Sequence, residues 1–92
     1  MRVLWTEPAL DAIARIHDYL FDFNPRAAQH VAETPRAAGD GLMVFPHRGR
    51  PVPGTGLREL ITSYPWIIRY RIDGDGVVIL RVRHASRRPT NP

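Results

Sequence analysis

The sequence contains neither cysteine nor lysine. Without cysteine the chain can form no disulfide and no thiolate metal site, and this fits a cytoplasmic protein. Its four histidines show no close metal-binding spacing, so we expect neither a metal nor another cofactor. Phosphate-cradling P-loop motifs and nucleophile-elbow motifs are also missing.

Long hydrophobic runs are absent as well. Val77–Leu80, which is among the longest apolar runs, is far too short to cross a bilayer, so no membrane partner is expected. The N-terminus begins with a strand pattern rather than with the apolar block of a signal peptide. The 92 residues are expected to form one domain, 1–92, with one thin core.

Basic charge is abundant and unevenly distributed. Arginine supplies all thirteen basic residues, against nine acidic residues, for a net charge of +4. Residues 1–45 hold four arginines and six acids, a net of −2, whereas residues 46–92 hold nine arginines and three acids, a net of +6. A basic half is typical of a protein that binds an anionic partner, either nucleic acid or an acidic protein segment.

The start of the chain predicts a strand followed by a helix. Residues 2–6 combine β-branched and aromatic residues, as strands do. Thr6 then has the character of a helix N-cap before Glu7 and Pro8. The helix should end near Phe23, and its apolar positions form one stripe: Leu10, Ile13, His17 and Leu20.

A second helix is expected at once, because Asn24 can cap it and Pro25 suits its first turn. Its apolar positions recur at spacings of three and four: Ala28, Val31, Pro35, Ala38, Leu42 and Phe45. Pro35 lacks the backbone N–H that a continuous helix needs, at a cost of about 3 kcal/mol. We therefore expect a kink near Pro35 or a split there, with Thr34 capping a new helical piece.

The second half predicts a loop and then an antiparallel sheet. Residues 46–56 contain three prolines and three glycines and read as a loop. Strand-like segments follow at 57–62, 66–73 and 77–84, which favours an antiparallel meander. The predicted fold is α+β: an N-terminal strand, an α-helical hairpin and a three-stranded antiparallel meander, with the helices on one face of the sheet.

The last two strands predict one dry face and one arginine-rich face. A three-residue loop at 74–76 would place Asp73 opposite Val77. The face toward the helices then carries the pairs Ile72–Val78, Tyr70–Leu80, Ile68–Val82 and Trp66–His84. The opposite face carries the pairs Arg71–Ile79, Arg69–Arg81 and Ile67–Arg83.

The arginines of this second face are the candidate binding residues for an anionic partner. The set consists of Arg69, Arg71, Arg81 and Arg83, with Arg87 and Arg88 just beyond the strand. Two like charges directly opposite each other are unfavourable by themselves, which suggests a negative ligand. The alternative is a solvated face whose charges only keep the sheet from aggregating.

Several segments, taken in order, are similar to those of a known family: WTEPALDAIARIHDYL, NPRAAQHVAE, FPHRGRPVPGTGLREL, YPWIIRYRIDGDGVVILRVRH and the His-x-x-Arg tail of His84 and Arg87. Together they resemble the RelE/ParE superfamily of bacterial toxins from type II toxin–antitoxin modules. The resemblance implies a helical hairpin on an antiparallel sheet and a cognate antitoxin protein that wraps the toxin. The sequence departs from the family at Pro35, where the second helix is usually uninterrupted.

The superfamily contains two activities. RelE-like members cut messenger RNA on the ribosome, whereas ParE-like members poison DNA gyrase and have no established catalytic residues. Cleavage through a 2′-OH requires an acid, a base and cations around the phosphate. The candidates for these roles are His84 and Glu59 as proton carriers, and Arg58, Arg69 and Arg81 as phosphate-binding cations.

Departures from the RNA-cutting pattern favour the ParE-like branch. The chain has no lysine, which RelE-like enzymes often use, and PWII at 65–68 stands where many of them carry an arginine. His84 falls opposite Trp66 on the predicted core face, where a packed structural histidine is favoured over a proton carrier. We predict a gyrase-poisoning toxin. The alternatives are a ribosome-dependent endonuclease acting on mRNA, and an inactive relative kept only as a binding partner.

Overall fold

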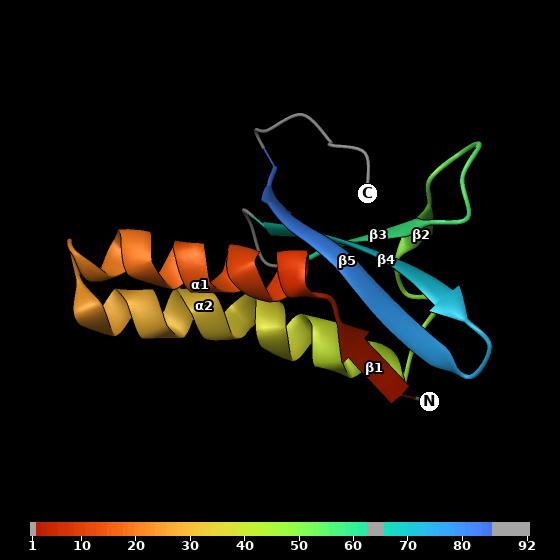
Figure 1. Cartoon of the computed structure of the whole chain (residues 1–92), viewed down its shortest axis with the longest axis horizontal. Helices are drawn as coiled ribbons and strands as arrows, with labels where there is room; N and C mark the ends of the chain where they lie inside the picture. The colour runs from red at the N-terminus through yellow and green to blue at the C-terminus, as the bar shows by residue number, and fades with distance from the viewer. Residues whose placement is uncertain (1, 63–65, 86–92) are drawn as a thin grey trace.

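The computed structural model describes residues 2–62 and 66–85. Its elements follow in the order β1 (Arg2–Trp5), α1 (Glu7–Phe21), α2 (Pro25–Asp40), the short 3-10 helix η1 (Gly41–Met43), β2 (Arg50–Pro51), β3 (Arg58–Ile61), β4 (Trp66–Asp73) and β5 (Gly76–His84). The strands form one sheet in the order β1-β5-β4-β3-β2, in which β1 runs parallel to β5 and the other neighbours are antiparallel. Figure 1 shows α1 and α2 side by side, with the free end of the hairpin extending beyond the strands. The predicted α+β layout is confirmed.

Both helix starts follow from local sequence, but they use different contacts. Asn24 caps α2, because its side-chain oxygen accepts a hydrogen bond from the Ala27 N–H at 3.2 Å. Thr6 holds the N-cap position of α1, yet its hydroxyl donates to the Ile79 carbonyl at 2.8 Å instead of accepting from the helix. A side-chain hydrogen bond therefore joins the start of α1 to β5.

The predicted split at Pro35 is not observed, because α2 is one continuous helix from Pro25 to Asp40. Thr34 caps no new helix; its hydroxyl donates to the His30 carbonyl, one turn earlier, at 3.2 Å. The Pro35 ring is fully buried. Burial of this ring offsets part of the cost of the missing backbone hydrogen bond, and the helix continues through Pro35 despite its low helix propensity.

The buried stripe of α1 is rotated from the predicted one by about one residue. Ala9 is completely buried, while Leu10 is 40% exposed. Ala12, Ile13 and Ile16 pack against the core. The apolar face of α1 is wide enough to include either stripe, and the contacts with the sheet decide which one is buried.

Small residues line the buried side of α2, and one of them lets the helix approach the sheet closely. Its buried positions are Ala28, Ala32, Pro35 and Gly39. Of the other predicted positions, Ala38 is partly buried against the core and Val31 is partly buried. A Cβ atom at Gly39 would collide with the Trp5 ring and with Ile79. Close approach therefore explains why a glycine faces the sheet here. Phe45, predicted at the end of the same stripe, is instead 66% exposed.

The predicted register of the last hairpin is wrong between the turn and Leu80, and it is correct from the Arg69–Arg81 pair onward. The turn has two residues, Gly74 and Asp75, because Asp73 pairs with Gly76, and Gly74 takes the positive φ of 61° that such turns favour. A bulge follows at Leu80, beyond which Arg69 again faces Arg81 as predicted.

The bulge changes which side chains of β5 enter the core. Val77 and Ile79 are fully buried, and Val82 is 8% exposed beyond the bulge. The predicted core residues Val78 and Leu80 are only partly buried. One inserted residue reverses the alternation of a strand, so the prediction failed on the turn side of Leu80 alone.

Tyr70 ties the loop before β2 to the core. Its ring is fully buried, and its hydroxyl donates to the Pro46 carbonyl at 2.6 Å while accepting from the Gly49 N–H at 2.9 Å. A Cβ at Gly49 would lie 2.7 Å from the Tyr70 ring, so only glycine fits this approach. Within residues 2–62 and 66–85, neither long helix combines the length and the apolar character that a bilayer span requires.

Candidate functional site

The face of the sheet opposite the helices carries a cluster of charged side chains, which we call the arginine face. It consists of Glu59 on β3, Arg69 and Arg71 on β4, and Arg81 and Arg83 on β5. Three of these residues form one row across the strands, because Glu59 pairs with Arg69 and Arg69 pairs with Arg81. Strand pairing alone therefore assembles the cluster from three separate parts of the chain.

Glu59 joins two of the arginines. One of its carboxylate oxygens accepts hydrogen bonds from Arg69 at 3.1 Å from Nε and 2.9 Å from Nη2, and from Arg83 Nη2 at 3.3 Å. The side chains are 7% exposed for Glu59, 11% for Arg69 and 16% for Arg83. Burial makes each of these charges costly without its partners, so the three act as one unit.

The pKa of Glu59 lies below its ordinary value of 4.5. Burial acts in the opposite direction and raises this pKa, but the hydrogen bonds and positive charges of Arg69 and Arg83 outweigh it. Glu59 is therefore held as a carboxylate at neutral pH. A group in this state is poorly suited to donate a proton.

Arg81 has a different environment from Arg69 and Arg83. Its Nε is buried and has no hydrogen-bond partner within the described part of the chain, and no carboxylate there forms an ion pair with it. Arg71 is exposed and lies 3.8 Å from Asp73, a loose surface contact. Arg81 is thus the arginine of this face that has no carboxylate partner in the described part of the chain.

Arg58 lies on the helix side of the sheet rather than on the arginine face. It pairs with Tyr70 across the strands, and its Nη1 donates to the Gly49 carbonyl at 2.7 Å and to the His47 carbonyl at 3.4 Å. These bonds hold the same loop that Tyr70 holds. Arg58 therefore has a structural role in shaping the loop.

His84 packs against Trp66, as the sequence predicts. The two rings meet edge to face, with centroids 5.4 Å apart and an interplanar angle of 88°. His84 is partly buried, less completely than expected for a core residue. His84 lies opposite Trp66, the first residue of β4. Arg58 lies opposite Tyr70, four residues further along the same strand.

The five candidate catalytic residues are consequently not brought together in one place. Glu59, Arg69 and Arg81 share the arginine face. Arg58 and His84 lie on the helix side, opposite Tyr70 and Trp66, which are four residues apart along β4. Arg87 and Arg88, the remaining predicted binding residues, lie outside the described residues. Among residues 2–62 and 66–85, no three His, Asp or Glu side chains are grouped as a metal site would require.

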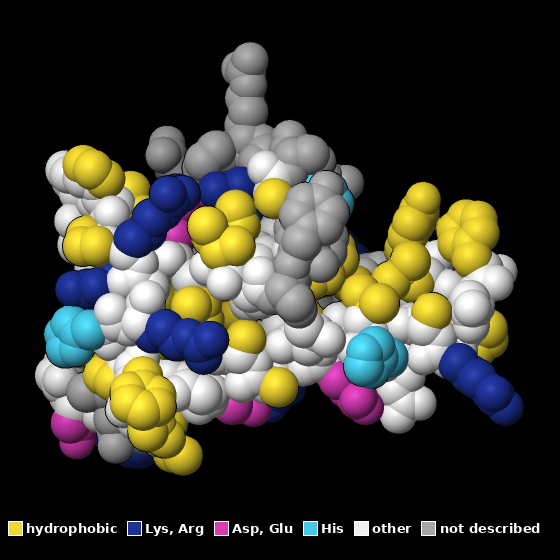
Figure 2. All heavy atoms as spheres, turned by 180° about the vertical axis from the view of Figure 1, so that it is seen from behind, with side chains coloured by type: hydrophobic (Ala, Val, Ile, Leu, Met, Phe, Trp, Pro, Cys, Tyr) yellow, Lys and Arg dark blue, Asp and Glu magenta, His cyan; other side chains and the backbone are white. Residues whose placement is uncertain are grey.

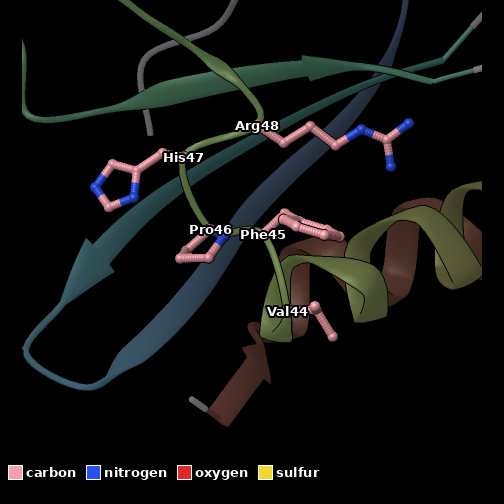
Figure 3. A pocket seen from close by; sticks show the side chains of 5 residues that line it. All are labelled: Val44, Phe45, Pro46, His47 and Arg48. Carbon is pink, nitrogen blue, oxygen red and sulfur yellow. The ribbon is translucent and has the colours of Figure 1, made fainter.

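A surface hollow lies in the segment between η1 and β2, where no site was predicted from the sequence. Val44, Phe45, Pro46, His47 and Arg48 line it, and Figure 3 shows His47 and Arg48 pointing in opposite directions from the loop. Val44 is 63% exposed and Phe45 is 66% exposed. The apolar run at 42–46 is the signal for this hollow in the sequence. The helical spacing predicts burial of Leu42 and Phe45 from this run, and only Leu42 is buried.

Comparisons with known proteins agree on one family. The family model for the ParE toxin of the type II toxin–antitoxin system, parDE, matches residues 3–89. The toxin RelE2 of Caulobacter vibrioides is 45% identical over 87 residues, covering 94% of this chain and 97% of that protein. The toxin RelE1 of the same organism is 36% identical over 73 residues, covering 76% and 77%.

Two solved structures share the fold. One belongs to the chromosomal ParDE toxin–antitoxin system from P. aeruginosa, with a TM-score of 0.83 at 23% identity, covering 94% of this chain and 97% of that chain. The other is the toxin–antitoxin complex RelBE2 from Mycobacterium tuberculosis, with a TM-score of 0.59 at 24% identity, covering 90% and 95%. The chain therefore belongs to the ParE toxin family, within the RelE/ParE superfamily of type II toxin–antitoxin toxins.

Proposed function

We propose that this toxin acts by binding and poisoning DNA gyrase, without catalytic chemistry of its own. The observation that carries the proposal is the sharing of Glu59 between Arg69 and Arg83. This arrangement keeps the carboxylate ionised and unable to serve as a general acid, while Arg58 and His84 lie on the other side of the sheet. What remains on the arginine face is the positive charge of Arg81 and of the exposed Arg71, which suits binding rather than proton transfer.

The second candidate is a ribosome-dependent endonuclease that cuts messenger RNA. Two observations favour it: the curated relatives carry the name RelE, and Arg81 offers a cation that no carboxylate of the described chain neutralises. A phosphate of the RNA backbone would supply the missing anion. This mechanism would require proton carriers other than a pair formed by Glu59 and His84, because these residues lie on opposite faces.

One experiment separates the two candidates. Purified toxin is added to a gyrase supercoiling assay and, separately, to a translating extract that contains a reporter mRNA. We expect inhibition of supercoiling and an intact reporter, and the same inhibition from the Glu59→Gln variant if it is folded. Site-specific mRNA cleavage that requires ribosomes, with supercoiling unaffected, would reverse the assignment.

We further propose that a cognate antitoxin neutralises this toxin in the cytoplasm by covering the arginine face. The solved relatives are described as toxin–antitoxin systems or complexes, which supports an antitoxin partner here. An acidic or apolar antitoxin segment would complement Arg81 and the exposed Arg71. Copurification of the toxin with the product of the adjacent gene, followed by a pull-down in rising salt, tests this contact.

A further inference from the structure

The loop between η1 and β2 has its backbone held by the sheet, while most of its side chains are exposed. Tyr70 bonds to the carbonyl of Pro46 and to the N–H of Gly49, at 2.6 and 2.9 Å. Arg58 donates to the carbonyls of His47 and Gly49, at 3.4 and 2.7 Å. These four hydrogen bonds order the loop in advance, so a partner would not have to supply the free energy of ordering it.

The side chains that this loop presents include large apolar ones. Three consecutive residues are exposed: Met43 by 54%, Val44 by 63% and Phe45 by 66%. The surface hollow beside them has a volume of about 520 Å³. Figure 3 shows Phe45 and Arg48 extending to the same side of the loop. A hollow of this size can receive an apolar side chain, whose burial would also cover the exposed residues of the loop.

The charge of this part of the chain is positive. Residues 41–58 hold three arginines, one histidine and no acid. Arg48 lines the hollow, and no carboxylate within residues 2–62 and 66–85 forms an ion pair with it. Figure 2 shows hydrophobic side chains next to Lys or Arg side chains on the half of the molecule away from the tip of the helical hairpin, at the left of that view.

The other two arginines of this segment have different surroundings. Arg50 pairs with Glu59 across β2 and β3, so its side chain lies on the side of the arginine face. Arg58 uses its Nη1 to hold the loop. Arg48 is therefore the arginine of the segment that borders the hollow.

Acids on the neighbouring elements do not reverse the sign of this charge. Asp40, at the end of α2, lies 3.7 Å from Arg36. Asp73, at the end of β4, lies 3.8 Å from Arg71. Asp75 is exposed in the β4–β5 turn, and within the described residues it is the acid of this group without an ion pair. One such acid does not balance the three arginines of the segment.

We propose that the loop is a docking site for an acidic segment of a partner protein that carries a large apolar side chain. The apolar side chain enters the hollow against Val44 and Phe45, and a neighbouring carboxylate of the partner pairs with Arg48. Side chains on the helix side of the sheet hold this loop, so the site is separate from the arginine face. The inference therefore stands whether or not the antitoxin covers that face and whatever the toxin targets.

The shape and charge of the site argue against other occupants. Nucleic acid is held by several cations along its backbone, whereas Arg48 is the arginine that lines this hollow. A second copy of the chain, docked through the same loop, would bring two Arg48 side chains together. A membrane receives side chains that protrude into it, whereas a hollow receives a side chain of its partner.

The test uses short labelled peptides that bind to the full-length toxin and are followed by fluorescence anisotropy. One peptide has a central tryptophan flanked by glutamates, and a second has lysines in place of the glutamates. We expect the glutamate peptide to bind at least about tenfold more tightly and to weaken as salt rises. A third peptide, with serine in place of the tryptophan, should lose about tenfold because nothing then fills the hollow.

Variants of the toxin then locate the binding surface. Phe45→Ser and Arg48→Gln should each weaken the glutamate peptide by about tenfold. Phe23→Ser is the matched control for the first, because Phe23 is a 74% exposed aromatic at the tip of the helical hairpin. Arg26→Gln removes an equal exposed charge from α2 and controls for the second. Arg81→Ala, on the arginine face, should change nothing, and circular dichroism checks that every variant is folded.

Several outcomes would overturn the proposal. These are equal binding of the glutamate and lysine peptides, no binding of the glutamate peptide, and equal effects of Arg48→Gln and Arg26→Gln. Loss of peptide binding in Arg81→Ala but not in Arg48→Gln would assign the acidic peptide to the arginine face instead.

A second measurement uses the absence of cysteine. Val44→Cys introduces a unique exposed thiol beside the hollow, and its alkylation by a maleimide should slow when the glutamate peptide binds. Light scattering, single-stranded oligonucleotides and phosphatidylglycerol vesicles test the other occupants. Dimers, or binding to oligonucleotide or vesicles, that Phe45→Ser abolishes would assign the loop to those occupants and contradict ours.

Discussion

Arg69 on β4 donates two hydrogen bonds to one carboxylate oxygen of Glu59 on β3, at 3.1 Å from Nε and 2.9 Å from Nη2. The sequence predicts that the arginines of this face point outward to a partner. The contact takes Arg69 out of solvent, to 9% exposure. It also shows why two arginines can face each other at the Arg69–Arg81 pair, since the nearby carboxylate offsets part of their repulsion. The charge cluster is therefore partly a structural element of the sheet.

Replacing Glu59 with glutamine should destabilise the protein. The amide keeps the shape of the side chain but leaves Arg69 and Arg83 without their shared negative charge. Breaking a buried ion pair typically costs about 3–5 kcal/mol, and we expect the lower end because Arg83 can reach solvent. Urea denaturation measures the change. The matched control is Asp73→Asn, whose loose exposed contact with Arg71 should matter little.

The same carboxylate should make stability depend on acid. The pKa of Glu59 is lower in the folded protein than its ordinary value of 4.5, so its contribution is fully present above about that pH. The contribution is lost as the pH falls through the folded pKa, because protonation must then break the ion pairs. The free energy of unfolding should fall more steeply between pH 6 and 3 in the wild type than in Glu59→Gln. Parallel curves would show that Glu59 is not the titrating group.

Arg81→Ala should weaken antitoxin binding by about tenfold, because a charge-assisted hydrogen bond to the partner would be lost. Arg26→Ala removes an equal charge from exposed α2 and serves as the control. Arg83→Ala should weaken binding too, but it also frees Glu59 and so should lower stability, which Arg81→Ala should not. Antitoxin affinity by calorimetry and melting temperature separate these effects. Unchanged affinity in both folded arginine variants would exclude the arginine face as the contact.

Pro35→Ala should raise the melting temperature. α2 is continuous, so alanine restores the backbone N–H and removes a helix penalty of about 3 kcal/mol. Loss of the buried ring offsets part of this gain, at about 0.8 kcal/mol for each methylene. We expect a net gain of about 1 kcal/mol. Scanning calorimetry checks it, and a lower melting temperature would mean that packing of the ring outweighs helix propensity.

His84→Gln should reduce stability by about 1 kcal/mol, because the edge-to-face contact with Trp66 is lost. Toxicity per folded molecule should stay near normal if His84 is structural. His17→Gln alters a half-exposed histidine on α1 and controls for the general effect of the substitution. Full stability with abolished toxicity would instead make His84 a functional residue and favour the endonuclease.

Local signals in the sequence determined the order of the elements and several of their boundaries. Asn24 and Pro25 start α2 because capping acts over only a few residues, and the cap is observed. Alternation along two strands joined by a short turn placed Arg69 opposite Arg81 and Trp66 opposite His84. Such pairings can be predicted from the two-residue period of a strand and the approximate position of the turn, and both depend only on residues close together in the sequence.

The tertiary structure decided the features that depend on distant contacts. Gly74–Gly76 is compatible with a turn of two or three residues, and burial of Val77 and Ile79 against the helices selects the shorter turn with a bulge at Leu80. The same kind of selection rotated the helix stripes and kept α2 intact through Pro35.

Charge pairing was also a tertiary outcome. Glu59 lies ten residues from Arg69 in the sequence and twenty-four from Arg83, and only the sheet brings the three together. Arginine spacing along β4 and β5 predicted a cationic face but carried no information about the acid on β3 that would neutralise part of it. Electrostatic partners depend on burial and on distances of a few ångströms, which strand alternation alone does not specify.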